Sequence, residues 1–585
     1  MSNVVTAGRP LLRMPATFAG RLALIAGLGG LLRVLYVLLV VADNPLSGDA
    51  AGYHHAANLF ADGAGFPEPL RHMFGGVDLI VRDGAEIIVG TPIGHLEPTA
   101  GHPPVWTLLL GAFSFLGAVT VLQQQVVAAL LGVPAILLVG LLGRELRSDR
   151  LGLTAAGLTA GYAFVWVNDG LLMAETAAIA AAAAASWAGL RFARDPSRRK
   201  AVVFGLVGGL AALSRAELLL MLPLLTTVVF LRSALPWRER ILRTSIAAAA
   251  TLMLLSPWVV RNLLVFEEPV FLSNGAGTVL VQANCDPTYY GDFLGYWRIE
   301  CGHPAPFGPA GEHLDESERD AVVLDRAMDY ISDHRSRLVT VVVPARIGRM
   351  WGVYDTVDQL HYDALLDRRP LAVSTLGFVQ YIALVPLAAA GAVLLRRRRE
   401  SLLAIAAWIP IATFTAAISF GNTRYRTAAE VSIVVLAAVA LDALAERRRQ
   451  PEQAPRRIVV AGVEGPLPHP PSTLRVTRLR ITDRHTHHSM NQEHLRHGLT
   501  KERRPRRAEV TVILPVAEAA PGPGDRERAT SRLSRRWTDV ASWPPWAHSS
   551  SSWGSGSRSC RSADLCRAAP TSTSSPLHGS AVARR

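Results

Sequence analysis

Long apolar runs separated by short basic clusters are the feature that most constrains this chain of 585 residues. A helix needs roughly 20 apolar residues to cross the hydrocarbon core of a bilayer, and several runs approach or reach that length. The candidate spans are residues 21–41, 124–142, 151–167, 171–190, 201–213, 218–231, 244–260, 371–395, 401–420 and 428–444. The sequence therefore predicts an all-α, polytopic transmembrane helical bundle of about ten spans.

The basic clusters predict which side of the membrane each connector faces, because such clusters favour the cytoplasm. They lie at residues 144–150, 191–200, 232–243, 396–399 and 447–449. Placing all of them inside leaves residues 43–104 as a first outer loop and residues 261–370 as a long outer loop. Counting the apolar run 105–119 as a span would invert the loops that follow. We therefore expect a juxtamembrane helix there, at the outer surface.

Composition limits the class of partner. The net charge of +13 alone would favour nucleic acid. The basic residues alternate with apolar runs, however, and 50% of the chain is hydrophobic while 18% is charged. We expect no nucleic-acid partner and a multi-pass protein of the plasma membrane, in contact with membrane lipid.

The chain divides into two predicted parts. Residues 1–447 form the membrane domain. Residues 448–585 are rich in Arg, Ser and Pro and cannot bury enough apolar surface to offset the entropy of ordering. They are predicted to be a disordered cytoplasmic tail, with a mis-joined reading frame as the alternative.

Acids in the predicted outer connectors are candidates for catalysis. Asp49 follows the first span in the run GDAAGYHH, which also holds His54. A carboxylate there could take a proton from a hydroxyl or bind a divalent cation, although most loop aspartates are only solvated. Glu175, in NDGLLMAET, is expected a turn and a half inside an apolar helix, where acids are costly and usually functional. Asp169 in the same run could instead cap that helix.

Several outer residues could bind an anion. Arg424 and Arg426 in GNTRYR, and Arg261 in PWVVRN, lie at the outer ends of spans, where the positive-inside bias does not explain an arginine. A guanidinium suits phosphate oxygens and stays charged. His102, in GHPPVW, could donate to a phosphate or cap the helix that follows.

Two pairs of residues remain in the outer connectors. Arg215 and Glu217, in LSRAE, could simply pair with each other. Cys285 and Cys301 fall in the long outer loop, where an oxidising compartment would favour a disulfide over two free thiols.

The order and spacing of these motifs resemble a known superfamily. Between about residues 21 and 444 the chain is similar to the GT-C membrane glycosyltransferases, in the branch of protein O-mannosyltransferases and aminoarabinose transferases. The motifs are GDAAGYHHAA, GHPPVWTLLL, NDGLLMAET, LSRAE, PWVVRN and GNTRYR. The resemblance implies transfer of a hexose or pentose from a polyprenyl-phosphate donor to a glycan, lipid or protein acceptor outside the cytoplasm.

The resemblance also implies roles for individual residues. Asp49 corresponds to the catalytic acid/base or metal-linked aspartate of the family. Many relatives carry two adjacent acids where this chain reads Gly48-Asp49-Ala50, so no cofactor is certain, and Asp49 is the candidate ligand if a divalent metal is bound. Relatives with lysine before the double proline use it for phosphate; here His102 stands in that place.

The expected mechanism is a single displacement through an oxocarbenium-like state. Asp49 would activate the acceptor hydroxyl and Glu175 would position the acceptor or the sugar. Arg424 and Arg426, together with Arg261, would stabilise the departing phosphate. His54 and His102 complete the expected substrate contacts.

Two other functions were weighed against this one. A flippase or transporter of lipid-linked sugars should show charges at mid-bilayer depth and internal repeats, and the sequence shows neither. A non-catalytic envelope-assembly protein would not need polar residues gathered at one face.

Overall fold

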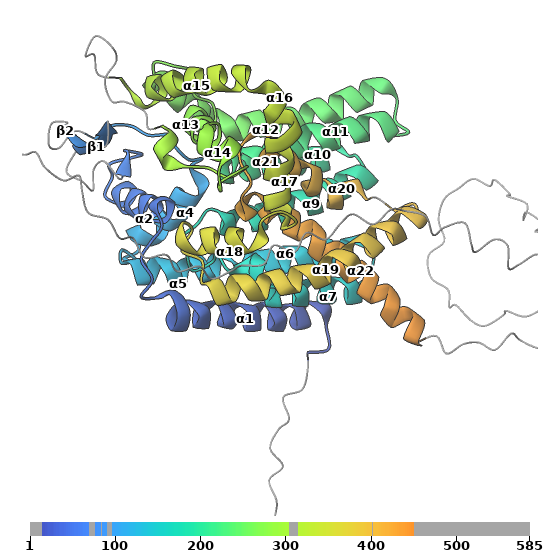
Figure 1. The fold of residues 1–585 in the computed structure, drawn as a ribbon. Helices are drawn as coiled ribbons and strands as arrows, with labels where there is room; N and C mark the ends of the chain where they lie inside the picture. The colour runs from blue at the N-terminus through green and yellow to red at the C-terminus, as the bar shows by residue number, and fades with distance from the viewer. Residues whose placement is uncertain are drawn as a thin grey trace, which may run out of the picture. The chain divides into compact units, whose positions relative to one another are not determined.

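A computed structural model describes residues 15–69, 77–82, 85–90, 96–302, 314–400 and 402–449. These residues form a helical bundle with one antiparallel hairpin, whose strands are β1 (Val77–Arg82) and β2 (Ala85–Gly90) (Figure 1). The predicted all-α polytopic fold is confirmed, and the hairpin is an addition to it. The predicted tail lies outside the described residues from position 450 onward.

Each predicted span coincides with helical structure. The elements are α1 and η1 (Phe18–Tyr36, Val37–Val41), α5 and α6 (Val121–Leu131, Val133–Leu146), α7 and α8 (Asp149–Gly161, Ala163–Trp166), α9 (Glu175–Arg194), α10 (Arg198–Ser214), η2 and α11 (Ala216–Leu220, Met221–Arg232), α12 (Trp237–Val265), α19 (Leu371–Arg397), α20 and α21 (Leu403–Ala406, Trp408–Ile418), and η5 and α22 (Thr423–Arg426, Thr427–Arg449).

Length and composition identify which helices can cross a membrane. Within the described residues, six segments qualify: Phe18–Val41, Val121–Leu146, Glu175–Arg194, Trp237–Val265, Leu371–Arg397 and Thr423–Arg448. The chain is therefore a multi-pass membrane protein. The count of about ten spans stays a prediction, because the other candidates form shorter helices.

The connectors predicted to lie outside are largely helical. Their helices are α2 (Gly48–Ala61), α13 (Ala276–Ala283), α14 (Asp286–Tyr290), η3 (Ile299–Cys301), α15 (Glu316–Asp333), α16 (Arg335–Arg337), η4 (Leu338–Val342), α17 (Val343–Trp351) and α18 (Thr356–Leu365). Local capping explains two of them. Ser47 accepts a hydrogen bond from the Ala50 N–H at the start of α2, and Asp315 and Glu318 form a capping box at the start of α15. The helix predicted over 105–119 is α4 (Val105–Phe115).

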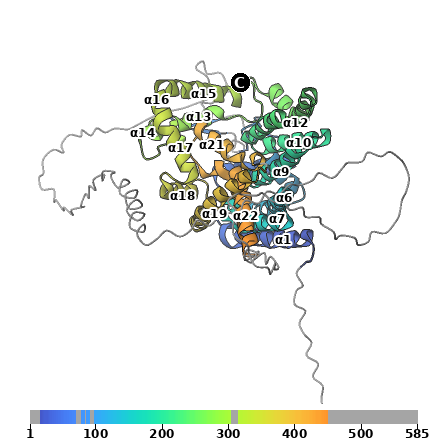
Figure 2. The same cartoon turned by 90° about the vertical axis from the view of Figure 1, so that its right-hand side faces the viewer.

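The helix α22 lies at the centre of the bundle. It packs against α19, α7, α9 and α21, and Figure 2 shows it between α19 and α7. Its residues from Thr427 to Ala440 are buried on all sides, and most of them are alanine or valine. Gly391 of α19 permits close backbone approach, since a Cβ there would lie 1.9 Å from the carbonyl oxygen of Leu436. Since η5 leads directly into the amino end of α22, the packing of α22 also fixes the position of η5.

A short non-helical connection between α8 and α9 determines the position of Glu175. Leu172 has a φ of 56°, in the left-handed region, so the chain does not continue as a helix from residue 171. The helix α9 begins at Glu175 itself. The prediction that Glu175 lies a turn and a half inside a helix is therefore wrong. The carboxylate lies at the positive end of the helix dipole, which favours its charge.

Candidate functional site

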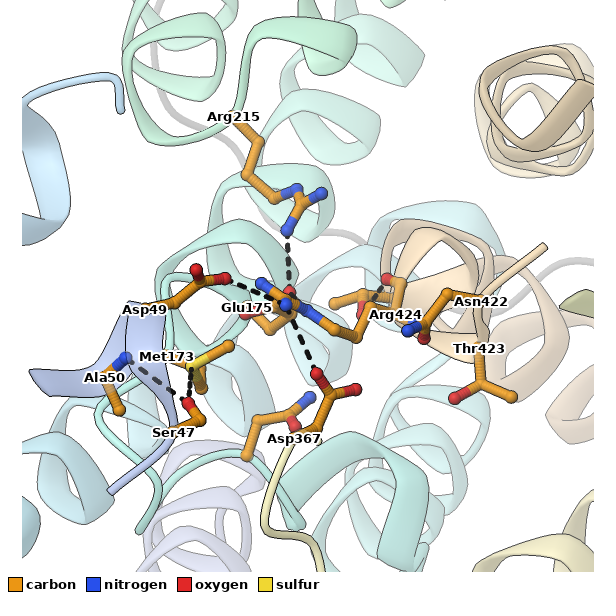
Figure 3. A network of polar contacts seen from close by, with 12 residues as sticks. Ser47, Asp49, Ala50, Met173, Glu175, Arg215, Asp367, Asn422, Thr423 and Arg424 are labelled. Carbon is orange, nitrogen blue, oxygen red and sulfur yellow. Dashed lines mark hydrogen bonds and ion pairs between the residues drawn. The ribbon is translucent and has the colours of Figure 1, made fainter. Parts of the chain in front are cut away.

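Arg424 is the residue on which several predicted outer segments converge (Figure 3). The side-chain oxygen of Asn422 accepts a hydrogen bond from the Arg424 backbone N–H at 2.8 Å, which fixes the start of η5. The Nε of Arg424 donates to Glu175 Oε1 at 2.7 Å. Its Nη1 lies 2.9 Å from Asp49 Oδ2 and 3.3 Å from Asp367 Oδ1. Carboxylates from three distant parts of the sequence thus meet at one guanidinium.

A second arginine joins this cluster. Arg215, between α10 and η2, donates from Nη1 to Glu175 Oε1 at 2.7 Å and from Nε to Glu217 Oε1 at 2.5 Å. The predicted pairing of Arg215 with Glu217 is present, but the same guanidinium also reaches Glu175. A small hollow between α9, α21 and α22 is lined by both arginines and by Glu217 and Tyr425. Apart from Thr427, the rest of its lining is apolar, so charged and apolar side chains meet there.

Asp49 is more accessible than the acids beside it. Its side chain is 40% exposed, against 1% for Glu175 and 7% for Asp367. Burial raises the pKa of Asp49, but the Arg424 guanidinium and His102 outweigh that effect and hold the pKa below its usual range. Asp49 is therefore an ionised carboxylate that an incoming ligand can reach. It can accept a proton, although the arginine weakens it as a base.

His102 borders the same cluster. Its ring lies 4.8 Å, centroid to centroid, from the ring of Tyr53, which is one helical turn after Asp49 on α2. No side-chain hydrogen bond caps α4, so the capping role weighed for His102 is absent. The histidine is exposed and close enough to Asp49 to influence its charge. Its expected contact with a phosphate stays a prediction.

Arg426 faces away from the cluster. Its Nε lies 2.5 Å from Glu430 Oε1, and its Nη1 donates to the Met350 carbonyl at 3.0 Å. The guanidinium is almost completely buried and lies over the ring of Tyr381. These contacts contradict the expectation that Arg426 joins Arg424 at a phosphate. Arg424 and Arg426 are two residues apart in a helical segment, so their side chains point to nearly opposite sides of it.

Arg261 and His54 also have partners elsewhere. Arg261 donates to the Thr99 carbonyl at 2.8 Å, and its guanidinium lies 5.1 Å from the centre of the Trp258 ring. His54 is buried, with its Nδ1 2.9 Å from Gln124 Oε1. Arg261 therefore joins the loop before α4 to α12, and His54 joins α2 to α5. Neither contact pattern supports the substrate-binding role expected from the sequence.

Part of the chain matches a known protein family. Residues 101–260 match the family model described as dolichyl-phosphate-mannose-protein mannosyltransferase. That family is one of GT-C mannosyltransferases, and the match covers residues 101–260 of the 585. The matched segment holds His102, Glu175 and Arg215, whereas Asp49 and Arg424 flank it in the sequence and meet it in space. The resemblance expected from the motifs is confirmed.

Solved structures of similar proteins share little sequence with this chain. The archaeal oligosaccharyltransferase AglB from Archaeoglobus fulgidus, in complex with an inhibitory peptide and a dolichol-phosphate, has a TM-score of 0.41 and 15% identity over 74% of this chain and 50% of its own. ArnT from Cupriavidus metallidurans, bound to undecaprenyl phosphate, has a TM-score of 0.31 and 16% identity over 73% of this chain and 77% of its own. The chain thus spans about half the length of AglB. No curated protein matches the chain.

A buried ion pair joins Arg33 to Asp169, and the sequence did not predict it. Arg33, inside the first span, donates to Asp169 Oδ2 at 2.6 Å, and both side chains are fully or almost fully buried. Asp169 also accepts from Thr176 Oγ1 at 3.0 Å. Asp169 is thus an anchor between α1 and the start of α9. An arginine inside an apolar run was the available signal, since it requires a buried partner, and it contradicts the expectation that no charge lies at mid-bilayer depth.

Asp367 was also missed. It precedes α19 in the run LLDRRPL, where the neighbouring arginines make it look like a solvated surface acid. Burial raises the pKa of Asp367, although Arg424 and Arg369 lower it. Arg369 is itself buried and donates to Asn168 Oδ1 at 3.0 Å and to Thr423 Oγ1 at 2.6 Å. This contact joins the segment before α19 to the residue that precedes Arg424.

A metal site was left open by the sequence analysis. Among the described residues, no group of three or more His, Cys, Asp and Glu side chains is arranged to hold a metal ion. The Asp49 carboxylate is engaged by Arg424. The residues around Asp49 therefore do not fit a divalent cation.

The two cysteines of the long connector are bonded to each other. Cys285, which precedes α14, and Cys301, the last residue of η3, form a disulfide. The bond lies in the connector predicted to face an oxidising compartment.

Proposed function

We propose that the protein is a membrane glycosyltransferase that moves a sugar from a polyprenyl-phosphate donor to a hydroxyl of an acceptor on the extracytoplasmic face. The acceptor is a glycan, a lipid or a protein. The membrane is the plasma membrane, and Asp49 is the base. The GT-C family of residues 101–260 supports the reaction class.

One observation carries the proposal. An accessible carboxylate and a guanidinium lie 2.9 Å apart where the ends of apolar helices meet. The carboxylate of Asp49 can take a proton from an acceptor hydroxyl, and Arg424 can bind the phosphate that leaves. In the hollow beside Arg424 charged and apolar side chains meet, which suits a phosphate attached to a lipid.

The proposed reaction is a single displacement at the anomeric carbon. The acceptor oxygen forms a bond to that carbon while the bond from carbon to phosphate oxygen breaks, and the phosphate leaves with the electron pair. Asp49 takes the hydroxyl proton. Arg424 and Arg215 offset the negative charge that grows on the leaving phosphate. Glu175, which accepts hydrogen bonds from both arginines, holds the two guanidinium groups in position.

Radiolabel transfer tests the proposal. Purified protein in lipid nanodiscs is incubated with polyprenyl phosphates that carry labelled hexoses or pentoses, and with cell-envelope extract as the source of acceptor. We expect label to pass from the lipid to an envelope fraction, and the Asp49→Asn protein to transfer far less. Equal transfer by both proteins, or none by the wild type with any donor, would reject the proposal.

A further inference from the structure

Arg369 links the three segments that supply Arg424 and the buried acids beside it. Its Nε donates to Asn168 Oδ1 at 3.0 Å, and its Nη1 donates to Thr423 Oγ1 at 2.6 Å. Asn168 lies in the connection before α9, whose first residue is an acid of the cluster, and Thr423 immediately precedes Arg424. Arg369 itself follows Asp367 by two residues. One guanidinium therefore holds these three segments together.

Asp363, on α18, completes this contact. Its Oδ2 accepts a hydrogen bond from the Thr423 hydroxyl at 2.5 Å and lies 3.3 Å from Arg369 Nη1. Its Oδ1 accepts a hydrogen bond from Gln359 Nε2 at 2.8 Å. The Thr423 oxygen thus accepts from the arginine and donates to the aspartate. We call Asp363, Arg369 and Thr423 the Arg369 network.

Stability alone does not explain the charged pair in the Arg369 network. The side chains of Asp363 and Arg369 are 0% and 3% exposed, so both are removed from water on folding. Pairing in the interior does little more than offset that cost, and apolar residues of similar volume often stabilise a core as well or better. A buried pair with fixed hydrogen bonds can instead define one geometry. Here that geometry belongs to the residue that precedes Arg424.

Arg424 lies between Thr423 and Asp49 in the view of Figure 3. Its backbone N–H donates to Asn422 Oδ1, so side chains of the two residues before it fix the start of η5. Asp49 comes from α2, to which the hydrogen bonds of the Arg369 network do not extend. The network therefore fixes the backbone of the arginine and leaves the proposed base able to separate from it.

We propose that Arg369 and Asp363, acting through Thr423, are positioning residues that hold the Arg424 guanidinium in the orientation that binds the donor phosphate. The inference rests on the function proposed above and adds residues that act through Arg424 without touching the donor. A guanidinium fork matches two phosphate oxygens only in a narrow range of orientations. A small rotation of η5 would therefore weaken donor binding and transfer together.

Two substitutions of Thr423 test the Arg369 network. Valine keeps the shape of threonine but forms neither hydrogen bond, whereas serine keeps the hydroxyl. The full chain in nanodiscs is titrated with polyprenyl phosphate. We expect Thr423→Val to weaken binding roughly 3- to 30-fold, as for residues coupled in one hydrogen-bond network, and Thr423→Ser to stay within roughly twofold of the wild type. Asp363→Asn, which removes the charged acceptor of the Thr423 hydroxyl, should weaken binding in the same direction as Thr423→Val.

A double variant shows whether Thr423 acts through Arg424. In the Arg424→Ala background there is no guanidinium to orient, so adding Thr423→Val should weaken binding no further. Two effects that simply multiply would mean that Thr423 and Arg424 act independently, and would overturn the proposal.

Chemical modification of Arg424 gives a readout that needs no lipid. Phenylglyoxal reacts with accessible guanidinium groups, and peptide mass spectrometry measures the adduct at each arginine. We expect Thr423→Val to be modified severalfold faster at Arg424 than the wild type, because its guanidinium is no longer held against Glu175 and Asp367. Thr423→Ser should keep the wild-type rate.

Thr251→Val is the matched control. The Thr251 hydroxyl is buried and donates from α12 to the Gly205 carbonyl of α10 at 2.8 Å, so this variant also loses a buried hydrogen bond between two elements. It should keep the wild-type affinity for polyprenyl phosphate and the wild-type modification rate at Arg424. Monodispersity and melting temperature show whether each variant is folded.

The outcomes separate the Arg369 network from the proposed function. If folded Thr423→Val keeps both the wild-type affinity and the wild-type modification rate, the positioning role is rejected. It is also rejected if Thr251→Val shows the same changes as Thr423→Val. If Arg424→Ala leaves the affinity for polyprenyl phosphate unchanged, the phosphate assignment of the proposed function fails. The modification rate then still shows whether Thr423 orients Arg424.

Discussion

Arg424 and Asp49 carry opposite charges, and the proposed reaction gives each of them a role. The two side chains form an ion pair at 2.9 Å. Glu175 and Asp367 occupy further edges of the same guanidinium. A donor phosphate must therefore compete with carboxylates for Arg424. The same competition would release Asp49 from its arginine at the moment when a base is needed.

Replacing Asp49 with asparagine separates chemistry from binding. Asp49→Asn keeps the size of the side chain but removes the base, so turnover should fall roughly 10²–10⁴-fold. Donor affinity should hold or improve, because a carboxylate that competes for Arg424 is lost. Turnover by radiolabel transfer and donor titration measure the two effects. Asp62→Asn, at the exposed end of the same helix, is the control. Near-normal turnover in folded Asp49→Asn protein would rule out Asp49 as the base.

Replacing Arg424 should shift the pH profile. Arg424 lowers the pKa of Asp49 while burial raises it, so Arg424→Ala should increase that pKa. A base works only when it is deprotonated, and kcat/KM falls as the pH drops through its pKa. The acidic limb of kcat/KM should therefore move to higher pH in Arg424→Ala. Arg424→Lys keeps the charge and should leave the limb near its wild-type position.

Affinity gives a second measure of the same substitution. Arg424→Ala should weaken donor binding roughly 10- to 100-fold, the range for hydrogen bonds to a charged group. Lysine should rescue binding only in part, because a point charge cannot form the bidentate contact of a guanidinium. If the acidic limb of the kcat/KM profile does not move in Arg424→Ala, Asp49 is not the group that titrates.

Part of the cluster could be predicted from the sequence. Asp49, Glu175 and Arg424 stood out because an acid near an apolar run or an arginine at an outer helix end needs a cause. Arg426 shared that signal, and only helical geometry would have shown that it faces the other way. Asp367 carried no signal, because its burial depends on how the segment before α19 packs against α22.

At the scale of elements, the buried pair between Arg33 and Asp169 attaches α1 to the rest of the bundle. Arg33 is fully buried and donates to the Gly29 carbonyl as well as to Asp169. Removing either member leaves one charge buried without its partner. Such a loss is far more costly than the loss of an exposed ion pair.

We therefore expect Arg33→Met to destabilise the protein by about 3–5 kcal/mol. The double variant Arg33→Met with Asp169→Leu should recover most of that loss, because no unpaired charge remains. Unfolding in nanodiscs, followed by tryptophan fluorescence, measures both. Arg21→Gln, at the exposed start of the same helix, is the control. A double variant no more stable than Arg33→Met would argue against the pairing.

The presence of the helices was predicted more accurately than the residues at which they begin. Apolar length identified the helices of all ten candidate spans, because that signal does not depend on tertiary contacts. The start of α9 was misplaced, since nothing in NDGLLMAET marks the left-handed Leu172. The capping box at Asp315 and Glu318 was readable and would have indicated α15 in the long connector.

At the scale of the whole molecule, the predicted orientation can be tested by labelling. Single cysteines replacing Arg198 and Gly291, in a chain whose native cysteines are changed to serine, should differ in their access to a membrane-impermeant maleimide. Basic clusters favour the cytoplasm, so position 198 should be protected in intact cells and position 291 labelled. The opposite pattern would place the cluster around Arg424 on the cytoplasmic side.

The predicted tail gives a second test at this scale. Truncation after Gln450 removes no residue of any described helix, since α22 ends at Arg449. Radiolabel transfer should then stay within roughly twofold of the full chain, as for changes remote from a site. Loss of transfer in a folded, membrane-inserted truncation would assign the tail a role in the reaction.

The pair between Arg33 and Asp169 also has a consequence for biogenesis. The two residues are 136 positions apart, so the first span leaves the ribosome long before its counter-charge is made. An arginine at mid-helix costs roughly 2.5–3.5 kcal/mol on insertion. The segment Phe18–Val41 is otherwise strongly apolar, with a mean hydropathy of 2.4 in its 18-residue window, so we expect the helix to insert alone. Arg33 would then stay in the membrane without its partner until the turn that carries Asp169 is synthesised and packs against α1.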